Sequence, residues 1–333
     1  MPLLSGSNPA DVQTGAQRLA AGELVAFATE TVYGLGANAL DDAAVAAIYA
    51  AKGRPAGHPL IVHVASLEAA LHFSPALGAS ARKLLSAFWP GPLTVIGPRA
   101  VGVGVTAAGG QDSIGLRMPA HPVALALLRQ AAALGVKGVA APSANRFGRV
   151  SPTTAAHVQQ EFGSSLTVLD GGACTVGIES TILDCTCDPP VLLRPGQLGS
   201  AALEQLLGHS LGQRGLHTPR APGSLKSHYA PRTPVRLMQA ADLAAALAGL
   251  AGLEQSGQVV ERVAVYSRHA FTAQEAVLAW RQMPESAADA ARELFSVLRD
   301  LDDLAVDTIW VEQPPASADW DGVRDRLQRA ATA

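Results

Sequence analysis

The sequence contains few cysteines and no long hydrophobic run. Its three cysteines, Cys174, Cys185 and Cys187, form no CxxC pair and no paired metal-ligand spacing, which excludes a disulfide framework and favours a reducing compartment. No stretch of about twenty uninterrupted apolar residues is present, so no membrane span is expected. The N-terminus, MPLLSGSNPAD, lacks the basic region and the apolar run of a secretory signal. These absences predict a cytoplasmic protein that has no membrane partner.

Several common catalytic and binding motifs are also absent. The chain has no GxxxxGK[ST], GxSxG, HExxH or EF-hand loop. Gly102, Gly104 and Ala107 match a relaxed dinucleotide pattern, but Pro98 interrupts the run before them and no helical pattern follows, so we treat the match as chance. Aromatic residues make up only 5% of the chain, and no RNP, KH or helix-turn-helix pattern occurs. This composition argues against a base-stacking RNA platform.

Charge is distributed unevenly along the chain, although the formal net charge is only −3. Residues 43–160 contain ten Lys and Arg against two acids, Glu68 and Asp112, which gives this segment a net charge of +8. From residue 239 to the end, fifteen acids stand against eight bases, a net charge of −7. The first segment therefore favours anionic ligands, and the second segment faces a different partner.

The order of the apolar runs predicts two α/β domains, because 333 residues with 48% hydrophobic content are long for one core. Short strand-like runs alternate with helical patterns, and prolines bound several strands, which favours a mixed sheet. The expected strands are residues 23–29 and the runs PLIVHV, PLTVIG, SIGLRMP, KGVAAPS, LTVLD, STILDC and PVLLRP. The expected helices are one that begins at Pro9 after the N-cap Asn8, and others at about 41–52, 79–88, 121–134 and 153–161.

The texture of the sequence changes after residue 209. Residues 210–233 are rich in proline and base and contain no acid, so we interpret them as a linker or lid. Residues 234–333 then form a smaller α/β domain, with strands VRLM, VAVYS and VDTIWVE and helices at 240–252, 285–303 and in DWDGVRDRLQRA. The predicted division is therefore a domain over 1–209, the linker over 210–233 and a second domain over 234–333.

The stretch KGRPAGHPLIVHV, residues 52–64, gathers two cations and two histidines in thirteen positions. Lys52, Gly53 and Pro55 read as an ordinary helix stop. Arg54 and His58 are not explained by that stop. His63 alternates with the apolar residues of its strand, which is typical of a half-buried structural histidine, but its place in this cluster makes a ligand contact an equal alternative.

Polar residues recur where other predicted strands end. The TETVYGLG segment follows a strand and carries glycines, which indicate either a turn with positive φ or a ligand-binding strand end. Arg117 lies within an apolar strand and needs a carboxylate, either from elsewhere in the fold or from a ligand. Ser151, followed by Pro152, is predicted to cap a helix, and Arg146 and Arg149 beside it favour an anion site.

Taken together, these motifs resemble the threonylcarbamoyl-AMP synthase family (YrdC-like). They are TETVYGLG, KGRP…HPLIVH, FWPGPLT, LRMPAHP, APSAN…SPTT, GIESTILD and LLRPG, in the family's order from about residue 5 to 205. The basic linker and the smaller C-terminal unit are similar to the long, two-domain branch. The resemblance implies an α/β fold in which a twisted, mostly mixed sheet surrounds a positively charged cavity, plus a smaller Rossmann-like α/β domain.

The resemblance also implies a reaction and a set of site residues. L-threonine, bicarbonate or CO₂, and ATP would give L-threonylcarbamoyl adenylate and pyrophosphate, a nucleotidyl transfer that feeds tRNA modification. Lys52 and Arg54 would be catalytic. The expected threonine contacts are Thr31, His63, Arg117, Ala141 and Ser180. The expected nucleotide contacts are Arg54, His58, Ser113, Ser143, Asn145, Ser151, Arg194 and Tyr229. The linker would close over the cavity.

The same resemblance implies Mg²⁺ with ATP as cofactor, held mostly by the nucleotide and water, with no metal ligands from the protein. ATP, L-threonine and bicarbonate are the expected small-molecule partners, and tRNA or the downstream tRNA threonylcarbamoyl-transferase complex are further candidates. Two alternatives stay open. An RNA-binding module would use the basic surface without catalysis, and a carbamoyl-phosphate-using transferase would share the anion cavity without needing ATP.

Overall fold

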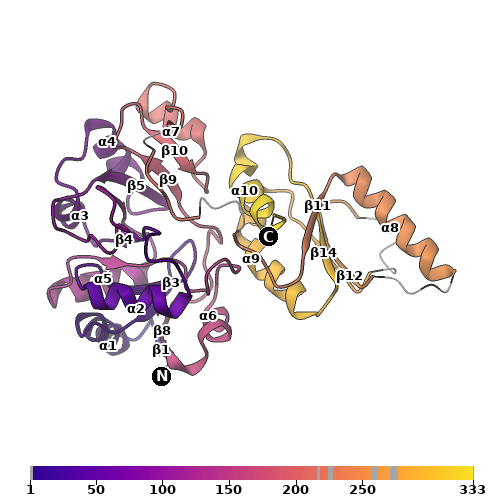
Figure 1. Cartoon of the computed structure of the whole chain (residues 1–333), viewed down its shortest axis with the longest axis horizontal. Coiled ribbons are helices and arrows are strands. Elements are labelled where there is room, and N and C mark those ends of the chain that lie inside the picture. The colour runs from indigo at the N-terminus through magenta and orange to yellow at the C-terminus, as the bar shows by residue number, and fades with distance from the viewer. Residues whose placement is uncertain are drawn as a thin grey trace. The chain divides into compact units, whose positions relative to one another are not determined.

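The chain folds into two compact units in a computed structural model (Figure 1). Unit 1 consists of residues 1–147 and 151–224, and unit 2 of residues 148–150 and 225–333. The boundary after residue 224 lies within the segment interpreted as a linker. The structure describes residues 3–215, 218–223, 228–256, 258, 261–270 and 277–332.

Unit 1 is built on one ten-stranded sheet with the strand order β1-β8-β2-β3-β7-β4-β6-β5-β9-β10. The pairs β1/β8, β2/β8, β4/β6 and β5/β9 are parallel and the other pairs are antiparallel, so the sheet is mixed, as the sequence predicts. Its elements are β1 (Leu3–Ser5), α1 (Pro9–Ala20), β2 (Val25–Phe27), β3 (Gly34–Asn38), α2 (Asp42–Lys52), β4 (Ile61–His63), α3 (Leu67–Phe73), α4 (Ala79–Phe88), β5 (Leu93–Pro98), β6 (Ser113–Arg117), α5 (Pro122–Ala133), β7 (Val139–Ala140), α6 (Ala155–Phe162), the 3₁₀ turn η1 (Gly163–Ser165), β8 (Thr167–Asp170), β9 (Thr181–Asp184), β10 (Val191–Arg194) and α7 (Ser200–Leu207).

Two helix boundaries follow from the capping residues. Helix α1 begins at Pro9, and the Asn8 side chain accepts a hydrogen bond from the backbone N–H of Ala10. Helix α2 ends at Lys52 because Gly53 adopts the left-handed conformation, with φ of 63°. Both boundaries confirm the sequence prediction, and the second one carries Lys52 and Arg54 to the end of a helix.

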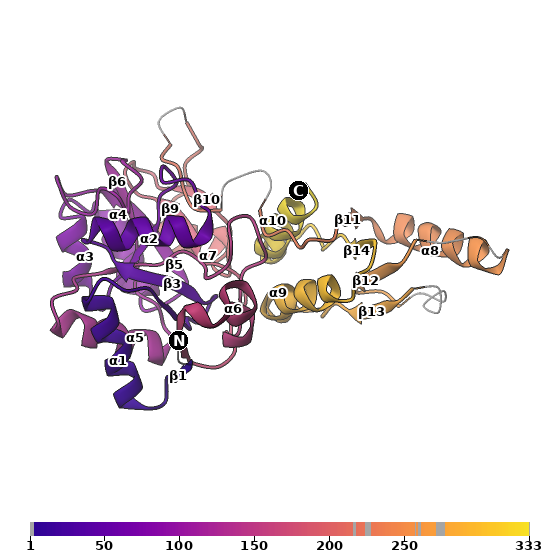
Figure 2. The same ribbon diagram turned by 60° about the horizontal axis from the view of Figure 1, so that its bottom comes forward.

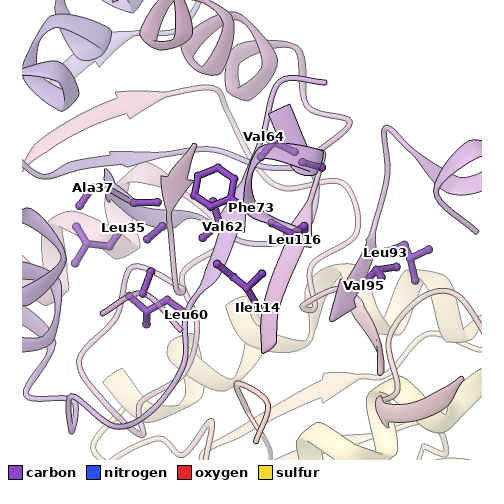
Figure 3. Packing of buried hydrophobic residues seen from close by; sticks show 14 of the residues in the cluster. Leu35, Ala37, Leu60, Val62, Val64, Phe73, Leu93, Val95, Ile114 and Leu116 are labelled. Atoms are coloured by element: carbon purple, nitrogen blue, oxygen red, sulfur yellow. The ribbon is translucent and has the colours of Figure 1, made fainter. Parts of the chain in front are cut away.

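The period-two alternation of the central strands separates a core face from a second face. Leu60, Val62 and Val64 alternate with Ile61 and His63 along the β4 segment. Figure 3 shows Val62, Val64, Ile114, Leu116, Leu93 and Val95 of β4, β6 and β5 in the main apolar cluster. The opposite face of the same strands carries the polar residues His63, Ser113, Arg117 and Thr94, next to a smaller apolar cluster.

Helices α1 and α5 lie side by side against one end of the sheet (Figures 1 and 2). Leu19 and Leu127 of these helices belong to one buried cluster with Phe27 and Leu169 of β2 and β8. Gly15 lets the two helices approach closely, because a Cβ at this position would come within 3.2 Å of Leu127. This packing fixes the strands that lead into the TETVY segment.

The glycines of TETVYGLG do not form a turn with positive φ, so that expectation is wrong. Gly34 and Gly36 lie inside strand β3, which pairs with β2 and β7. A Cβ at Gly36 would meet Phe27 and Val139 at 2.8 Å, so crowding rather than backbone conformation requires glycine there. The sequence also did not predict β1, β3, α3, η1 and α7 in this unit, which are short or lack a clear period.

Unit 2 contains a four-stranded, fully parallel sheet with the order β11-β14-β12-β13. Leu243, Leu247 and Leu250 of α8 pack on Val263 and Val265. The Tyr266 hydroxyl, on the other face of β12, donates to Glu293 of α9, so the two helices lie on opposite faces (Figure 2). The elements are β11 (Val235–Met238), α8 (Ala240–Gln255), β12 (Val263–Ser267), β13 (Ala279–Gln282), α9 (Ala287–Asp303), β14 (Thr308–Glu312), the 3₁₀ turn η3 (Ala318–Trp320) and α10 (Asp321–Ala330).

A buried aspartate organises one end of unit 2. Asp302 accepts hydrogen bonds from the backbone N–H groups of Arg232 and Thr233 and pairs with the Arg149 guanidinium at 3.4 Å. These bonds hold the pKa of Asp302 below its ordinary value although burial raises it. Within the described part of this unit, the sequence did not predict strand β13 and the 3₁₀ turn η3.

No helix in the described part of the chain is long and apolar enough to cross a membrane.

Replacing Gly36 by Ala tests the crowding between β2, β3 and β7. Because the new methyl group would overlap Phe27 and Val139, we expect Gly36→Ala to lower the free energy of unfolding of unit 1 by about 1–3 kcal/mol. Gly199→Ala is the matched control, since a Cβ there meets no atom within 4 Å. Urea denaturation followed by circular dichroism measures both changes, and equal effects would contradict the crowding argument.

Candidate active site

The polar face of the central strands ends at a buried ion pair between Arg117 and Glu30. The Arg117 Nη2 lies 2.6 Å from Glu30 Oε1, and both side chains are less than 10% exposed. Arg117 also donates from Nη1 to Thr31 Oγ1 at 2.7 Å and from Nε to the Gly91 carbonyl at 3.2 Å. Burial has the largest single effect and raises the pKa of Glu30, but the charge of Arg117, its hydrogen bond and two backbone hydrogen bonds together outweigh burial, so the net pKa is lowered. The carboxylate that Arg117 needs is therefore supplied by the fold.

His63 lies beside Arg117, since the two residues are register partners in the parallel pair β4/β6. Its side chain is only 3% exposed, and its ring meets the edge of Phe27 at a centroid distance of 6.2 Å. Burial, and then the charge of Arg117, lower the pKa of His63 to about 3. His63 is therefore neutral at physiological pH, and its Nδ1 has no hydrogen-bond partner among the residues the structure describes.

Ser180 connects strand β5 to Arg194. The Ser180 hydroxyl lies 2.8 Å from Thr94 Oγ1, and Arg194 donates to both the hydroxyl and the carbonyl of Ser180. Ala141 is buried next to strand β4, and its N–H donates to the Ile61 carbonyl. Ser180 and Ala141 thus border the polar face on which Arg117 and His63 stand.

Lys52 reaches from the end of α2 into the loop that follows β7. Its Nζ donates to the backbone carbonyls of Ser143 and Asn145, and the side chain is almost fully buried. Burial, followed by the positive charge of Arg54, lowers the pKa of Lys52 well below its ordinary value. The predicted nucleotide residues Ser143 and Asn145 are therefore brought to the predicted catalytic Lys52.

Arg54 and His58 gather around the aromatic ring of Phe147. The Arg54 guanidinium carbon lies 5.6 Å from the ring centroid, and Arg54 Nη2 donates to the Pro59 carbonyl at 2.9 Å. The His58 ring meets the edge of Phe147 at 5.5 Å. Burial, then the charges of Arg54 and Arg220, lower the pKa of His58. Because α2 ends at Gly53, Arg54 and His58 lie in the loop after this helix, where both contact Phe147.

Ser151 does not cap helix α6, so that expectation is wrong. The helix begins at Ala155, and Thr154 is its N-cap, accepting from the His157 N–H. Ser151 is fully buried, and its hydroxyl donates to the Glu179 carboxylate instead. This contact joins the PSAN…SPTT loop to the GIESTILD segment, since Glu179 directly precedes Ser180.

Most of the residues predicted from the sequence fall into three groups. Thr31, His63 and Arg117 meet at one end of the polar face, and Ser180 and Arg194 stand beside it. Lys52, Ser143 and Asn145 form the second group, and Arg54 and His58 the third. Ser113 lies at the opposite end of β6 from Arg117. Tyr229 belongs to unit 2, where its ring packs on Phe295 and Arg326 with centroid distances of 5.6 and 5.3 Å.

Three site residues were missed at the sequence level: Glu30, Glu179 and Thr94. Both acids stand in motifs that drew attention for other residues, TETVYGLG and GIESTILD. The charge count ran over residues 43–160, which excludes both. Glu30 is an acid within an apolar motif, and Arg117 is a base within an apolar strand far away in the sequence. These two observations together would have predicted the ion pair.

Comparison with known proteins places this geometry in a family. Residues 17–196 match the family described as telomere recombination (Sua5, YciO and YrdC), and residues 199–332 match the threonylcarbamoyl-AMP synthase C-terminal domain. The threonylcarbamoyl-AMP synthase of Pyrococcus abyssi is 39% identical over 319 residues, covering 93% of this chain and 91% of the relative. That of Bacillus subtilis is 36% identical, covering 98% of this chain and 94% of the relative.

A solved structure supports the same conclusion. P. abyssi Sua5 complexed with L-threonine superposes with a TM-score of 0.87 at 36% identity, covering 97% of this chain and 95% of that one. The mixed sheet of unit 1 thus defines a YrdC-like fold. The chain belongs to the threonylcarbamoyl-AMP synthase family, in its long two-domain form, which confirms the resemblance noted from the motifs.

Neutralising Glu30 tests the buried ion pair. Because Glu30→Gln leaves the Arg117 charge buried without its carboxylate, we expect a loss on the order of 3 kcal/mol in the free energy of unfolding at pH 7. Glu23→Gln is the matched control, since it removes an exposed pair with Arg18 and should cost less than about 1 kcal/mol. Chemical denaturation of both variants measures the difference.

The same variant makes a prediction about pH. A carboxylate whose folded pKa is lowered stabilises the fold above its ordinary pKa of 4.5 and loses that contribution as the pH falls through the folded value. The stability gap between the wild type and Glu30→Gln should therefore narrow only below pH 4.5. A gap that is constant down to strongly acid pH would contradict a charged Glu30.

Proposed function

We propose that the protein is a nucleotidyltransferase that makes L-threonylcarbamoyl adenylate and pyrophosphate from L-threonine, bicarbonate and ATP. The observation that carries the proposal is the set of buried cations, Lys52, Arg54, Arg117 and Arg194, set among short hydroxyls in a chain of this family. Burying cations is costly unless partners compensate them. Threonine, its carbamate and ATP are all anionic or zwitterionic, so a site that holds fixed cations suits these substrates.

The threonine end of the site has a low net charge. Arg117 is neutralised by Glu30, and His63 is uncharged because its pKa is about 3. This setting suits a zwitterionic amino acid, whose carboxylate Arg117 would attract. We assign Thr31, His63, Arg117, Ala141 and Ser180 to threonine. The neutral histidine offers a ring nitrogen for hydrogen bonding without adding a second positive charge beside Arg117.

The nucleotide end is cationic. We assign Lys52 and Arg54 to the reacting phosphates, with His58, Ser113, Ser143, Asn145, Ser151 and Arg194 as further ATP contacts. The carbonyls of Ser143 and Asn145 aim Lys52 Nζ, and the Pro59 carbonyl aims Arg54. Fixed donors of this kind stabilise developing charge without reorganisation. Tyr229 stays a prediction as an ATP contact, since it lies in unit 2.

The chemistry follows from bringing the two ends together. The threonine amine attacks bicarbonate to give a carbamate and water. A carbamate oxygen then forms a bond to the α-phosphorus of ATP, and the bond between that phosphorus and the bridging oxygen breaks to release pyrophosphate. The residues of this chain bind, orient and balance charge, and no covalent enzyme intermediate is needed.

Mg²⁺ fits this site only as a companion of ATP. Within the part of the chain that the structure describes, no group of three or more His, Cys, Asp and Glu could hold a metal ion. Glu30 and Glu179 already contact Arg117 and Ser151, and the Glu161 carboxylate accepts from the Arg146 N–H. The phosphate oxygens and water would therefore hold the ion, which would shield the phosphate charge.

The product implies later partners. We propose that the adenylate passes its threonylcarbamoyl group to an adenosine of tRNA, with a separate transferase complex as the acceptor enzyme. A purely RNA-binding role would leave the buried cations without use, since they lie inside unit 1 rather than on its surface.

Pyrophosphate release tests the proposed reaction. With ATP and Mg²⁺, we expect release only when both threonine and bicarbonate are present, accompanied by formation of the adenylate. Coupled phosphate detection and mass spectrometry measure the two products. Release that does not depend on threonine, or none at all, would overturn the proposal, and turnover with carbamoyl phosphate in place of ATP would favour the transferase alternative.

Removing Arg54 tests the charge assignment. One charge-assisted hydrogen bond is worth roughly 1.5–3 kcal/mol, so Arg54→Ala should lower kcat/KM for ATP by at least about tenfold. Arg129→Ala, on the exposed side of α5, is the control and should change it by less than about twofold. Similar losses in both variants would show that only the total charge of the domain matters.

A further inference from the structure

Residues 218–223 pack across the polar face of unit 1. The side chain of Gln111 accepts from the Arg220 N–H at 2.8 Å and donates to the Arg220 carbonyl at 3.2 Å. Ala221 is buried in the cluster of Ile61 and Ile182, which lines this face. These contacts hold the segment, which we call the strap, against strands β4, β5, β6 and β9.

The strap also touches the cationic part of the site. Arg194, which holds Ser180, donates from Nη1 to the Pro222 carbonyl at 3.2 Å. A small cavity lies under the strap, and its lining includes Pro222, Arg220, Ser113, Thr94 and Ile61. Ser113 is one of the residues assigned to the nucleotide, so the strap forms a wall of the same space.

The guanidinium of Arg220 lies near His58. Its Nη1 would lie 3.6 Å from a Cβ at Gly57, the residue before His58, and its Nη2 is 3.5 Å from the Gly109 carbonyl. Burial lowers the pKa of His58, and the positive charges of Arg54 and Arg220 lower it further. No carboxylate in the described residues lies within ion-pair distance of Arg220. A cation without an acidic partner among the described residues, beside residues assigned to the nucleotide, suits an anionic ligand.

We infer that Arg220 is a further nucleotide-binding residue, which binds a phosphate oxygen of ATP from the strap side while Arg54 and His58 bind from the helix side. This inference rests on the proposed function. A guanidinium suits the role because its paired N–H groups match phosphate oxygens. Gln111 acts as a positioning residue, since it fixes both backbone groups of Arg220 and so places the side chain beside His58.

Arg220→Ala is the direct test. We expect the Kd of ATP, measured by isothermal titration calorimetry, to rise about tenfold to a hundredfold, which corresponds to one charge-assisted contact. The KM for threonine should change by less than about twofold. Arg220→Lys should recover part of the loss, because it restores the charge without the paired donors. The thermal transition should not move, since the Arg220 side chain is exposed.

Arg214→Ala is the matched control from the same linker. Arg214 is also exposed, but it donates to the carbonyls of Leu192 and Leu193, so its loss should leave the Kd of ATP within about twofold of the wild type. An unchanged Kd in Arg220→Ala, or equal losses for Arg214→Ala, would overturn the inference. Threonine-dependent pyrophosphate release by the wild type tests the proposed function separately.

A double-mutant cycle tests the role of Gln111. If Gln111 acts through Arg220, then Gln111→Ala should weaken ATP binding, and the double variant should bind no more weakly than Arg220→Ala alone. Additive losses would show that Gln111 acts independently of Arg220 and would remove it as a positioning residue.

Discussion

The alternation of side chains along β4, β5 and β6 is the constraint on which the rest of unit 1 depends. Every second residue of these strands enters the main core, so the residues between them must face the other side together. That side carries Ser113, Gly115 and Arg117 on one strand. A shift of one residue in register would bury the arginine in the core and expose the core residues. The same strand register therefore determines both the packing of the core and the position of the site.

The charges are arranged so that the two ends of this face differ. At one end the Glu30 carboxylate, which precedes β3, neutralises Arg117 at the end of β6. At the other end Lys52 is held by two backbone carbonyls, whose dipoles orient the ammonium group but do not cancel its charge. Burial, and then the positive charge of Arg54, lower the pKa of Lys52 against the opposing charges of Glu161 and Glu179. A zwitterionic amino acid requires a site of low net charge, whereas a polyphosphate requires a cationic site. The Arg117 end has the first property, and the Lys52 end has the second.

Local signals in the sequence identified much of this. Gly53 ends α2, Asn8 caps α1, and the strand runs were found because capping and period-two patterns act over a few residues. The partner of Arg117 was left open, because Thr31 and Glu30 lie more than eighty residues away in the chain. Ser151 was misjudged because Thr154 is an equally good cap, and only the fold shows that Glu179 takes the serine hydroxyl. Contacts between residues that are distant in the sequence cannot be predicted from the residues next to them in the chain.

The neutral state of His63 explains how a histidine is tolerated beside an arginine in a buried strand pair. A protonated His63 ring would place a second cation beside Arg117, with only the Glu30 carboxylate to balance both charges. Burial would make this arrangement costly in free energy. The fold avoids this cost by keeping the ring neutral, and Glu30 is then sufficient for Arg117. The same reasoning separates the two ends of the site. Arg117 is paired directly with a carboxylate and suits a zwitterion, whereas Lys52 is hydrogen-bonded to backbone carbonyls, close to the charge of Arg54, and suits the phosphates.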